Sequence, residues 1–184
     1  MQILNNYQAK KQNSFSLIEI MIGLSIIMIL CSLWPAHFFD FNRQVLMHEL
    51  DTLMVTFSYL QQRAMASYAA QEIIFDLHNG TYSYSKKANS RFIKKMPDSV
   101  KFGFLKHAHG PPSDPRKPIK KAITFEHNDP KVIQATFLPN GKVTPGTIYL
   151  VDKREKNMVA LTVPVSQVSY VRKYRYENNK WVCF

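Results

Sequence analysis

One long apolar run restricts this chain more than any other feature of its sequence. Over residues 15–34 the only side chains that can ionise are Glu19 and the weakly acidic thiol of Cys31. A helix of about twenty residues is long enough to cross the hydrocarbon core of a bilayer. A carboxylate in such a helix costs free energy unless it finds a partner, so Glu19 is predicted to have a function.

The flanks of the run predict its orientation. Lys10 and Lys11 precede it, and basic residues before an apolar segment hold the N-terminus in the cytoplasm. A removable secretory signal ends in small residues, whereas Leu33, Trp34 and Phe38 stand here, so the run is expected to be retained. The chain is therefore predicted to be a single-pass protein of the inner (plasma) membrane, with its C-terminal part outside the cytoplasm.

The stretch SFSLIEIMIGLSIIMIL, residues 14–30, resembles the N-terminal signature of type IV pilins and type II secretion pseudopilins. The resemblance implies that a prepilin peptidase cuts between Ser14 and Phe15 and methylates the new N-terminal Phe15. The family usually has glycine where Ser14 stands. The resemblance also implies that Glu19 pairs with the N-terminal amine of Phe15 on a neighbouring subunit. Such a buried ion pair would set the register between subunits.

A second helix is expected after the apolar run. Pro35 is predicted to interrupt or kink the first helix, because proline lacks a backbone N–H and its ring clashes with the preceding turn. Beyond it, apolar residues recur in steps of three and four, as on one face of a helix. The stripe consists of Leu46, Leu50, Leu53, Phe57, Leu60 and Ala64, and the polar residues off it are Arg43, Glu49, Gln62 and Arg63. We expect this stripe to pack on a sheet of the same chain; self-association as a coiled coil is the alternative.

The chain from residue 71 onward is predicted to be antiparallel β-structure, since short β-branched and aromatic runs alternate there with Gly, Pro and Asn. The predicted strands are EIIFDL, TYSYS, VKFGFL, AITFEH, VIQATFL, GTIYLV, NMVALTV, SQVSYVRKYRY and KWVCF. HNG at residues 78–80 predicts a hairpin turn. The proline-rich residues 107–121 are expected to form an exposed loop. The predicted fold class is α+β and pilin-like, with a long N-terminal helix packed on an antiparallel β-domain.

A second resemblance covers residues 135–152, ATFLPNGKVTPGTIYLVD. This stretch looks like the late strand, turn and strand of the GspH/FimT group of minor pilin-like subunits. The matching positions are Phe137, Pro139, Gly141, Gly146, Ile148 and Leu150.

The sequence predicts no enzyme, cofactor or metal site. It has no P-loop, no dinucleotide-binding glycine motif and no nucleophile elbow. His48 lacks the second histidine that a zinc-protease helix carries four residues later, so His48 and Glu49 are interpreted as a surface pair. The other residues weighed as metal ligands are His107, His109, Glu126 and His127, which are expected to be solvated.

The C-terminus is strongly basic, in a chain whose formal net charge is +11. Cations alternate there with Tyr170, Tyr174, Tyr176 and Trp181, and the candidate nucleic-acid-binding residues are Arg172, Lys173, Arg175 and Lys180. Cations bind phosphates and aromatic rings stack on bases, so nucleic acid is a possible partner. The favoured alternative is a terminal hairpin whose aromatic residues pack inward while its charges face water. Some FimT-like subunits bind DNA through a Gly-Arg-x-Arg motif, which this chain matches only in part.

These observations predict four segments: a prepilin leader over residues 1–14, a transmembrane and filament-core helix over 15–35, an amphipathic helix over 36–70, and a GspH/FimT-like β-rich domain over 71–184. The predicted function is that of a minor subunit of a type II secretion pseudopilus, which supports protein secretion. Its expected partners are other pilin or pseudopilin subunits, the prepilin peptidase and an inner-membrane assembly platform. The alternatives are a DNA-binding minor pilin or competence pseudopilin, and a signal-anchored periplasmic binding module.

Overall fold

The computed structural model describes residues 16–38, 41–87, 90–110, 112–125, 133–165 and 170–184, with the backbone alone for residues 33–38 and 87. Its first unit is Met1–Phe39 and its second is Asp40–Phe184. The leader predicted over residues 1–14 lies outside the described residues.

Helix α1 (Leu17–Phe38) is the described part of the first unit. The helix is not interrupted at Pro35, because the backbone stays helical through Pro35 to Phe38; a kink at Pro35 stays a prediction. Proline hinders helix formation mainly in the residues that precede it, so a last turn can follow it. None of the helices in the described part of the chain combines the length and the apolar character needed to cross a membrane.

The first sheet of the second unit has strand order β3-β2-β1-β5 and is antiparallel throughout. Its strands are β1 (Gln71–Asp76), β2 (Thr81–Lys87), β3 (Ser90–Lys95) and β5 (Ile133–Phe137). The predicted hairpin joins β1 to β2: the Asp76 carboxylate accepts the N–H groups of His78 and Asn79, both at 3.0 Å, and Gly80 has φ +61°. Strand β3 was not predicted, because only Phe92 and Ile93 of SRFIKK are apolar.

The second sheet has strand order β4-β6-β7-β8-β9. Its strands are β4 (Val100–Phe102), β6 (Gly146–Asp152), β7 (Met158–Val163), β8 (Arg172–Glu177) and β9 (Lys180–Cys183). Every residue of β7 is buried, because the sheet is covered on both faces. The strand predicted at AITFEH, residues 122–127, is not a regular strand over its described residues, where Ile123 forms an isolated bridge with Ile148. Residues 126–127 lie outside the described part.

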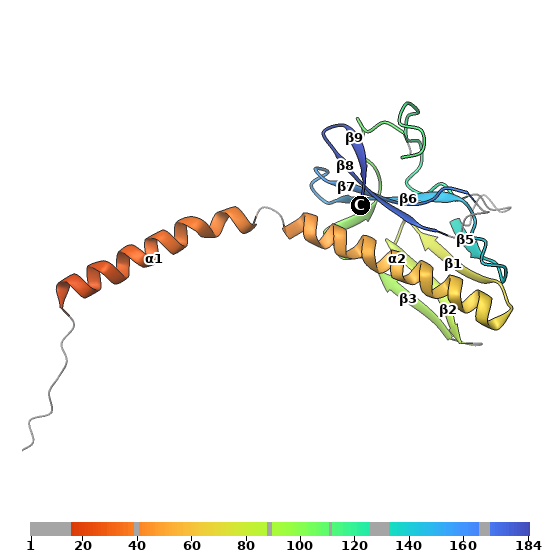
Figure 1. The fold of residues 1–184 in the computed structure, drawn as a ribbon, viewed down its shortest axis with the longest axis horizontal. Coiled ribbons are helices and arrows are strands. Elements are labelled where there is room, and N and C mark those ends of the chain that lie inside the picture. Colours follow the sequence, from red (N-terminus) through yellow and green to blue (C-terminus); the bar gives the residue numbers. More distant parts are fainter. Residues whose placement is uncertain (1–15, 39–40, 88–89, 111, 126–132, 166–169) are drawn as a thin grey trace, which may run out of the picture. The chain divides into compact units, whose positions relative to one another are not determined.

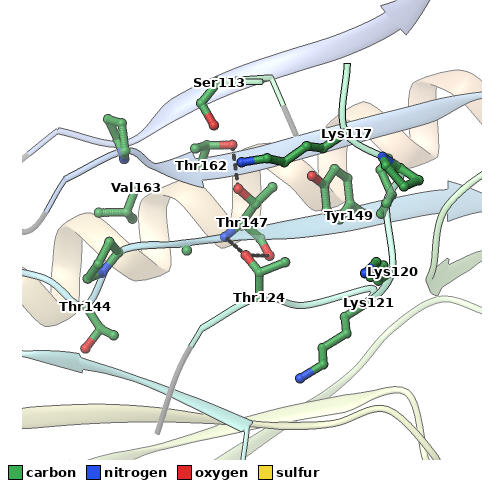
Figure 2. Close-up of a pocket in the computed structure, with 15 residues that line it drawn as sticks. Ser113, Lys117, Lys120, Lys121, Thr124, Thr144, Thr147, Tyr149, Thr162 and Val163 are labelled. Atoms are coloured by element: carbon green, nitrogen blue, oxygen red, sulfur yellow. Dashed lines mark hydrogen bonds between the residues drawn. The ribbon is translucent and has the colours of Figure 1, made fainter. Parts of the chain in front are cut away.

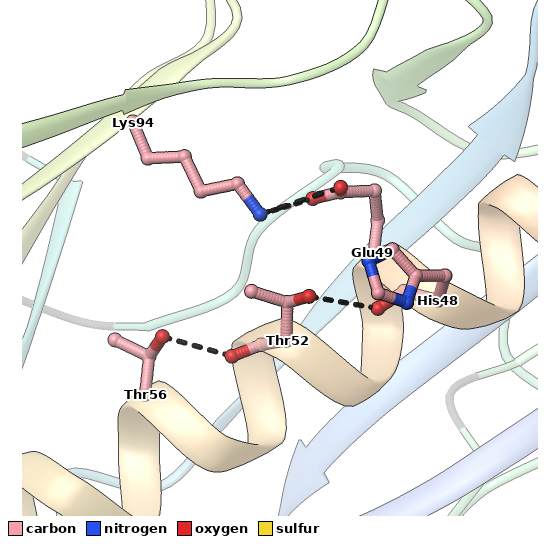
Figure 3. Close-up of polar contacts among 5 residues, drawn as sticks. All are labelled: His48, Glu49, Thr52, Thr56 and Lys94. Atoms are coloured by element: carbon pink, nitrogen blue, oxygen red, sulfur yellow. Dashed lines mark hydrogen bonds and ion pairs between the residues drawn. The ribbon is translucent and has the colours of Figure 1, made fainter.

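Helix α2 (Phe41–Ser67) packs against strands of both sheets (Figure 1). The predicted stripe is confirmed: each of its six residues has 0% of its surface exposed. Phe57 is central to this core, with ring centroids 5.1 Å from Phe137 and 6.0 Å from Phe125. The placement of Glu49 on the polar face was wrong, because Glu49 is 4% exposed and pairs with Lys94 of β3 (Figure 3).

The stretch that resembles the GspH/FimT group has a structural role in this core. Phe137, Ile148 and Leu150 are fully buried. Gly141 has φ +80°, a left-handed conformation that glycine adopts without strain. A Cβ atom at Gly146 would collide with the ring of Phe125. These residues therefore shape the turn and the close packing between β5 and β6.

Candidate functional site

The start of α1 is the first candidate site, and it carries Glu19. The N–H of Ser16 donates to Oε2 of Glu19 at 3.0 Å, and the N–H of Glu19 donates to Oγ of Ser16 at 3.3 Å. This reciprocal pair is a capping box, which satisfies two N–H groups at a helix start. Glu19 thus has a partner inside its own chain. The sequence analysis missed this role of Ser16, although Ser-x-x-Glu before an apolar run is the signal for it.

The surface of α1 is apolar on every side. From Leu17 to Leu30 its large apolar side chains are 52–77% exposed in the single chain. The other residues in that stretch are Glu19, Gly23 and Ser25, and the hydroxyl of Ser25 donates to the carbonyl of Met21 at 2.8 Å. A continuous exposed apolar surface of this kind marks a protein–protein or membrane contact. The predicted processing residues, Ser14 and Phe15, lie outside the described part of the chain.

The basic C-terminal residues have mainly intramolecular partners. Lys173 Nζ lies 2.7 Å from Oδ1 of Asp51 on α2. Arg175 Nε lies 2.7 Å from Oε1 of Glu177, and the same oxygen accepts a hydrogen bond from Arg43. Two of the four candidate nucleic-acid-binding residues thus pair with acids, Lys173 with Asp51 on α2 and Arg175 with Glu177 of its own strand.

Arg172 and Lys180 are the more exposed members of that candidate set. The guanidinium of Arg172 lies 4.6 Å from the ring centroid of Tyr170 and donates to its hydroxyl at 2.7 Å. Lys180 is an exposed residue at the start of β9. The structure does not bring the four cations together on one face, because neighbouring residues of a strand point to opposite sides.

The aromatic residues of the terminal hairpin pack inward. The Trp181 ring centroid lies 5.0 Å from that of Tyr176 and 5.9 Å from that of buried Tyr149. Its Nε1–H is 3.1 Å from the carbonyl oxygens of both His109 and Gly110. The hairpin therefore attaches the loop over residues 107–121 to the second sheet. The inward packing of these rings agrees with the hairpin that the sequence analysis favoured, whereas Lys173 and Arg175, which that alternative turned toward water, pair with acids.

A basic cleft lies beside this loop and is the second candidate site (Figure 2). It has a volume of about 1250 Å³ and is lined by the loop and by residues of β6 and β7. Three lysines line it, Lys117, Lys120 and Lys121, with a group of hydroxyl side chains from Ser113, Thr124, Thr144, Thr147 and Thr162. The sequence analysis missed this cleft; the signal for it was the lysine-rich stretch KPIKK at residues 117–121.

Hydrogen bonds order the threonines on the floor of the cleft. Thr147 donates its N–H to Oγ1 of Thr124 at 2.8 Å, and its own Oγ1 lies 3.2 Å from Oγ1 of Thr162. At the rim, the ammonium of Lys117 lies 3.0 Å from Oδ2 of Asp114, and this hydrogen bond lowers the pKa of Asp114. The side chains of Lys117 and Asp114 are 75% and 40% exposed, so water screens this ion pair.

The histidines considered for metal binding do not form a site in the described part of the chain. No group of three His, Cys, Asp or Glu side chains suitable for a metal ion is found among those residues. Nδ1 of His109 lies 3.1 Å from the carbonyl oxygen of His107, a local contact within the loop. Glu126 and His127 lie outside the described residues.

Comparison with known proteins bears on the first candidate site. Residues 9–34 match the family model of the prokaryotic N-terminal methylation motif. This chain is therefore type IV pilin-like in its N-terminal segment. Among solved structures, the chain is similar to the minor pseudopilin EpsH from the type 2 secretion system of Vibrio cholerae, with 14% identity and a TM-score of 0.45. That alignment covers 70% of the present chain and 94% of EpsH. No curated protein sequence matches the chain.

Proposed function

We propose that this protein is a pilin-like structural subunit that assembles into a filament through α1. The observation that carries the proposal is the helix itself: from Leu17 to Leu30 it exposes apolar side chains on every side, and the one charged residue of that stretch, Glu19, stands in the first turn. A helix that is apolar all round needs other helices or lipid to cover it. Before assembly the segment over residues 15–35 would hold the subunit in the inner membrane, and afterwards it would lie in the filament core.

Glu19 would change partner during assembly. In the single chain its carboxylate caps α1 by accepting the N–H of Ser16. After cleavage before Phe15, the α-ammonium of a neighbouring subunit supplies a full positive charge, which is a stronger partner than a backbone N–H. In a helix bundle that excludes water, this ion pair would fix the axial register of the subunits. The capping box survives processing, because Ser16 keeps its peptide N–H when Phe15 is the first residue.

The finer proposal is a minor subunit of a type II secretion pseudopilus. It is supported by the resemblance of residues 135–152 to the GspH/FimT group, whose glycines here occupy a left-handed turn and a close contact with Phe125. The partners would be other pseudopilin subunits, the prepilin peptidase and the assembly platform of the inner membrane. The β-domain would lie outside the cytoplasm, and its role would be structural rather than catalytic.

Processing is the first experiment. The intact mass and the N-terminal residue would be measured on protein purified from its native membrane. We expect a chain that begins with methylated Phe15. A chain that still begins with Met1, or that has been cut after the apolar run, would contradict the filament proposal and favour an anchored binding module.

Variants of the capping box separate the two roles of Glu19. Glu19→Gln can still accept the N–H of Ser16 but carries no charge, so we expect it to leave the chain folded and to prevent incorporation into filaments. Ser16→Ala keeps the charge and removes one capping bond, so we expect it to incorporate. Glu72→Gln, an exposed carboxylate on β1, is the matched control. Incorporation of Glu19→Gln at the wild-type level would refute the intersubunit ion pair.

DNA binding through the C-terminus is the second candidate function, and the net charge of +11 supports it. Of the four candidate residues, Arg172 and Lys180 are the two that are exposed and have no acidic partner among the described contacts, so they would carry the binding. The test is salt-dependent binding of a DNA oligonucleotide to the full chain in neutral detergent. If Arg172→Gln combined with Lys180→Gln left the affinity unchanged, this candidate would be excluded.

A further inference from the structure

We propose that the cleft between the loop over residues 107–121 and the second sheet binds an acidic polysaccharide, a chain of sugar rings that carry carboxylate or sulfate groups. The proposal concerns the second unit alone. It stands whether or not the protein assembles into filaments.

The charge of the cleft selects an anion. Lys117, Lys120 and Lys121 line it, and no Asp or Glu is among the described residues that form its walls. The ion pair of Lys117 with Asp114 is solvent-exposed, and exposed pairs of this kind contribute little free energy. An anionic ligand can therefore compete with Asp114 for the ammonium.

The hydroxyl groups of the cleft match a sugar. A Ser or Thr hydroxyl both donates and accepts hydrogen bonds, as a sugar hydroxyl does. Ser113 and Thr144 contribute such groups from the two sides of the cleft. The pair formed by Thr147 and Thr162 fixes the floor, with their Oγ1 atoms 3.2 Å apart. Carboxylate or sulfate groups would bind the lysines while the hydroxyls of the same chain bind these side chains.

The shape and the apolar walls favour a saccharide over a nucleic acid. Pro118, Pro145 and Pro164 present flat apolar surfaces on which sugar rings can lie. Single-stranded nucleic acid needs exposed aromatic rings on which bases stack, and the one aromatic residue of the described lining, Tyr149, is 1% exposed. The volume of about 1250 Å³ exceeds the roughly 300–1000 Å³ of small-molecule pockets, which suits a ligand of several units.

The loop that carries the lysines is held in place before any ligand binds. Trp181 donates to the carbonyl groups of His109 and Gly110, and His109 forms a β-bridge with Pro118. The N–H of Gly110 donates to the carbonyl of Lys117. Fixing a loop in its binding conformation reduces the entropy lost on association. The lysines are therefore presented on an ordered support.

The experiment is calorimetric titration of the full chain in neutral detergent with four probes of similar length. The probes are an oligogalacturonate, a sulfated dextran fragment, an uncharged dextran fragment and single-stranded oligothymidylate. We expect one or both acidic saccharides to bind, more weakly at high salt, and the uncharged fragment to show no binding. The tighter of the two acidic probes identifies the anionic group, carboxylate or sulfate.

Variants then locate the site. Lys117→Gln and Lys121→Gln are each expected to weaken binding by about tenfold or more, because each removes a charged hydrogen-bond donor. Ser113→Ala should weaken it by a smaller factor, as loss of a hydroxyl contact does. Lys153→Gln, an exposed lysine outside the cleft, is the control for net charge, and thermal unfolding verifies that each variant is folded.

Three outcomes would overturn the proposal. The first is that neither acidic saccharide binds the wild-type chain. The second is that oligothymidylate binds more tightly than both, which would identify the cleft as a nucleic-acid site. The third is that Lys153→Gln reduces the affinity as much as Lys117→Gln does, which would mean that the binding reflects overall charge.

Discussion

Glu49 and Lys94 join the N-terminal third of α2 to the edge strand β3, with Nζ of Lys94 2.9 Å from Oε2 and 3.3 Å from Oε1 of Glu49 (Figure 3). The carboxylate is almost fully buried, whereas the Lys94 side chain is 26% exposed. Nearby, the hydroxyl of Thr56 donates to the carbonyl of Thr52, so this polar group is also satisfied. The ion pair explains how a strand with few apolar residues is held against the helix.

Loss of this ion pair should destabilise the protein. Lys94→Met would leave the Glu49 carboxylate buried without its cation, and we expect the free energy of unfolding to fall by about 3 kcal/mol. The measurement is the urea midpoint of unfolding. Lys95→Met is the matched control, because the Lys95 side chain is 72% exposed and its ion pair with Asp98 is 3.9 Å long; its effect should stay within about 0.5 kcal/mol.

The same pair gives a test of coupling. Glu49→Leu combined with Lys94→Met replaces both charges by apolar groups, so we expect the double variant to be more stable than Lys94→Met alone. Equal urea midpoints for Lys94→Met and Lys95→Met would contradict the role assigned to the pair.

Stability should fall in alkali because of Tyr82. Burial raises the pKa of Tyr82 from 10.0 to about 12. Between these values the unfolded chain releases the phenolic proton while the folded chain retains it, so stability is full below pH 10.0 and declines as the pH rises. We expect Tyr82→Phe to reduce this decline by about 2 kcal/mol at most in the pH profile of the urea midpoint.

A methyl group at Gly146 should disturb the core. The Cβ of Gly146→Ala would collide with the Phe125 ring, and overpacking of this kind costs about 1–3 kcal/mol. Thermal unfolding of Gly146→Ala, Phe125→Leu and the double variant provides the check. We expect the two substitutions to be less destabilising together than the sum of their separate effects, and simple additivity would show that the contact does not matter.

The indole of Trp181 should control the order of the lysine-bearing loop. Trp181→Phe keeps a ring against Tyr149 and Tyr176 but removes the N–H donated to the carbonyls of His109 and Gly110. We expect faster amide hydrogen exchange over residues 107–121, with a loss of about 1 kcal/mol in global stability. Exchange in β1 should rise by no more than about fivefold, the factor that corresponds to 1 kcal/mol of global stability, which makes that strand the internal reference. Unchanged exchange in the loop would show that the hydrogen bonds donated by the Trp181 indole do not hold it in place.

The sequence predicted the parts of the fold that depend on regular patterns. The stripe from Leu46 to Ala64 is periodic, and every one of its residues is buried. The hairpin at residues 78–80 followed from local turn chemistry and is confirmed. Strand β3 carries no such pattern, because only Phe92 and Ile93 of its residues are apolar, although it pairs with β2 over its whole length.

The parts that could not be predicted depend on contacts between distant residues. Glu49 is off the apolar stripe by periodicity, and only the position of Lys94, 45 residues away, makes its burial possible. The cleft likewise combines a loop with strands β6 and β7. The capping contact of Glu19 with Ser16 is local, and the pattern Ser-x-x-Glu before an apolar run predicts it.

The hydrogen bond from Arg43 to Glu177, 2.8 Å long, has a mechanical consequence. Arg43 stands in the first turn of α2, where the second unit begins, and Glu177 ends β8 in the last hairpin of the chain. Tension applied through the N-terminal end of α2 would therefore reach the C-terminal hairpin directly. Because both side chains are about one-third exposed, this link can break and re-form under load while the buried stripe of α2 stays intact.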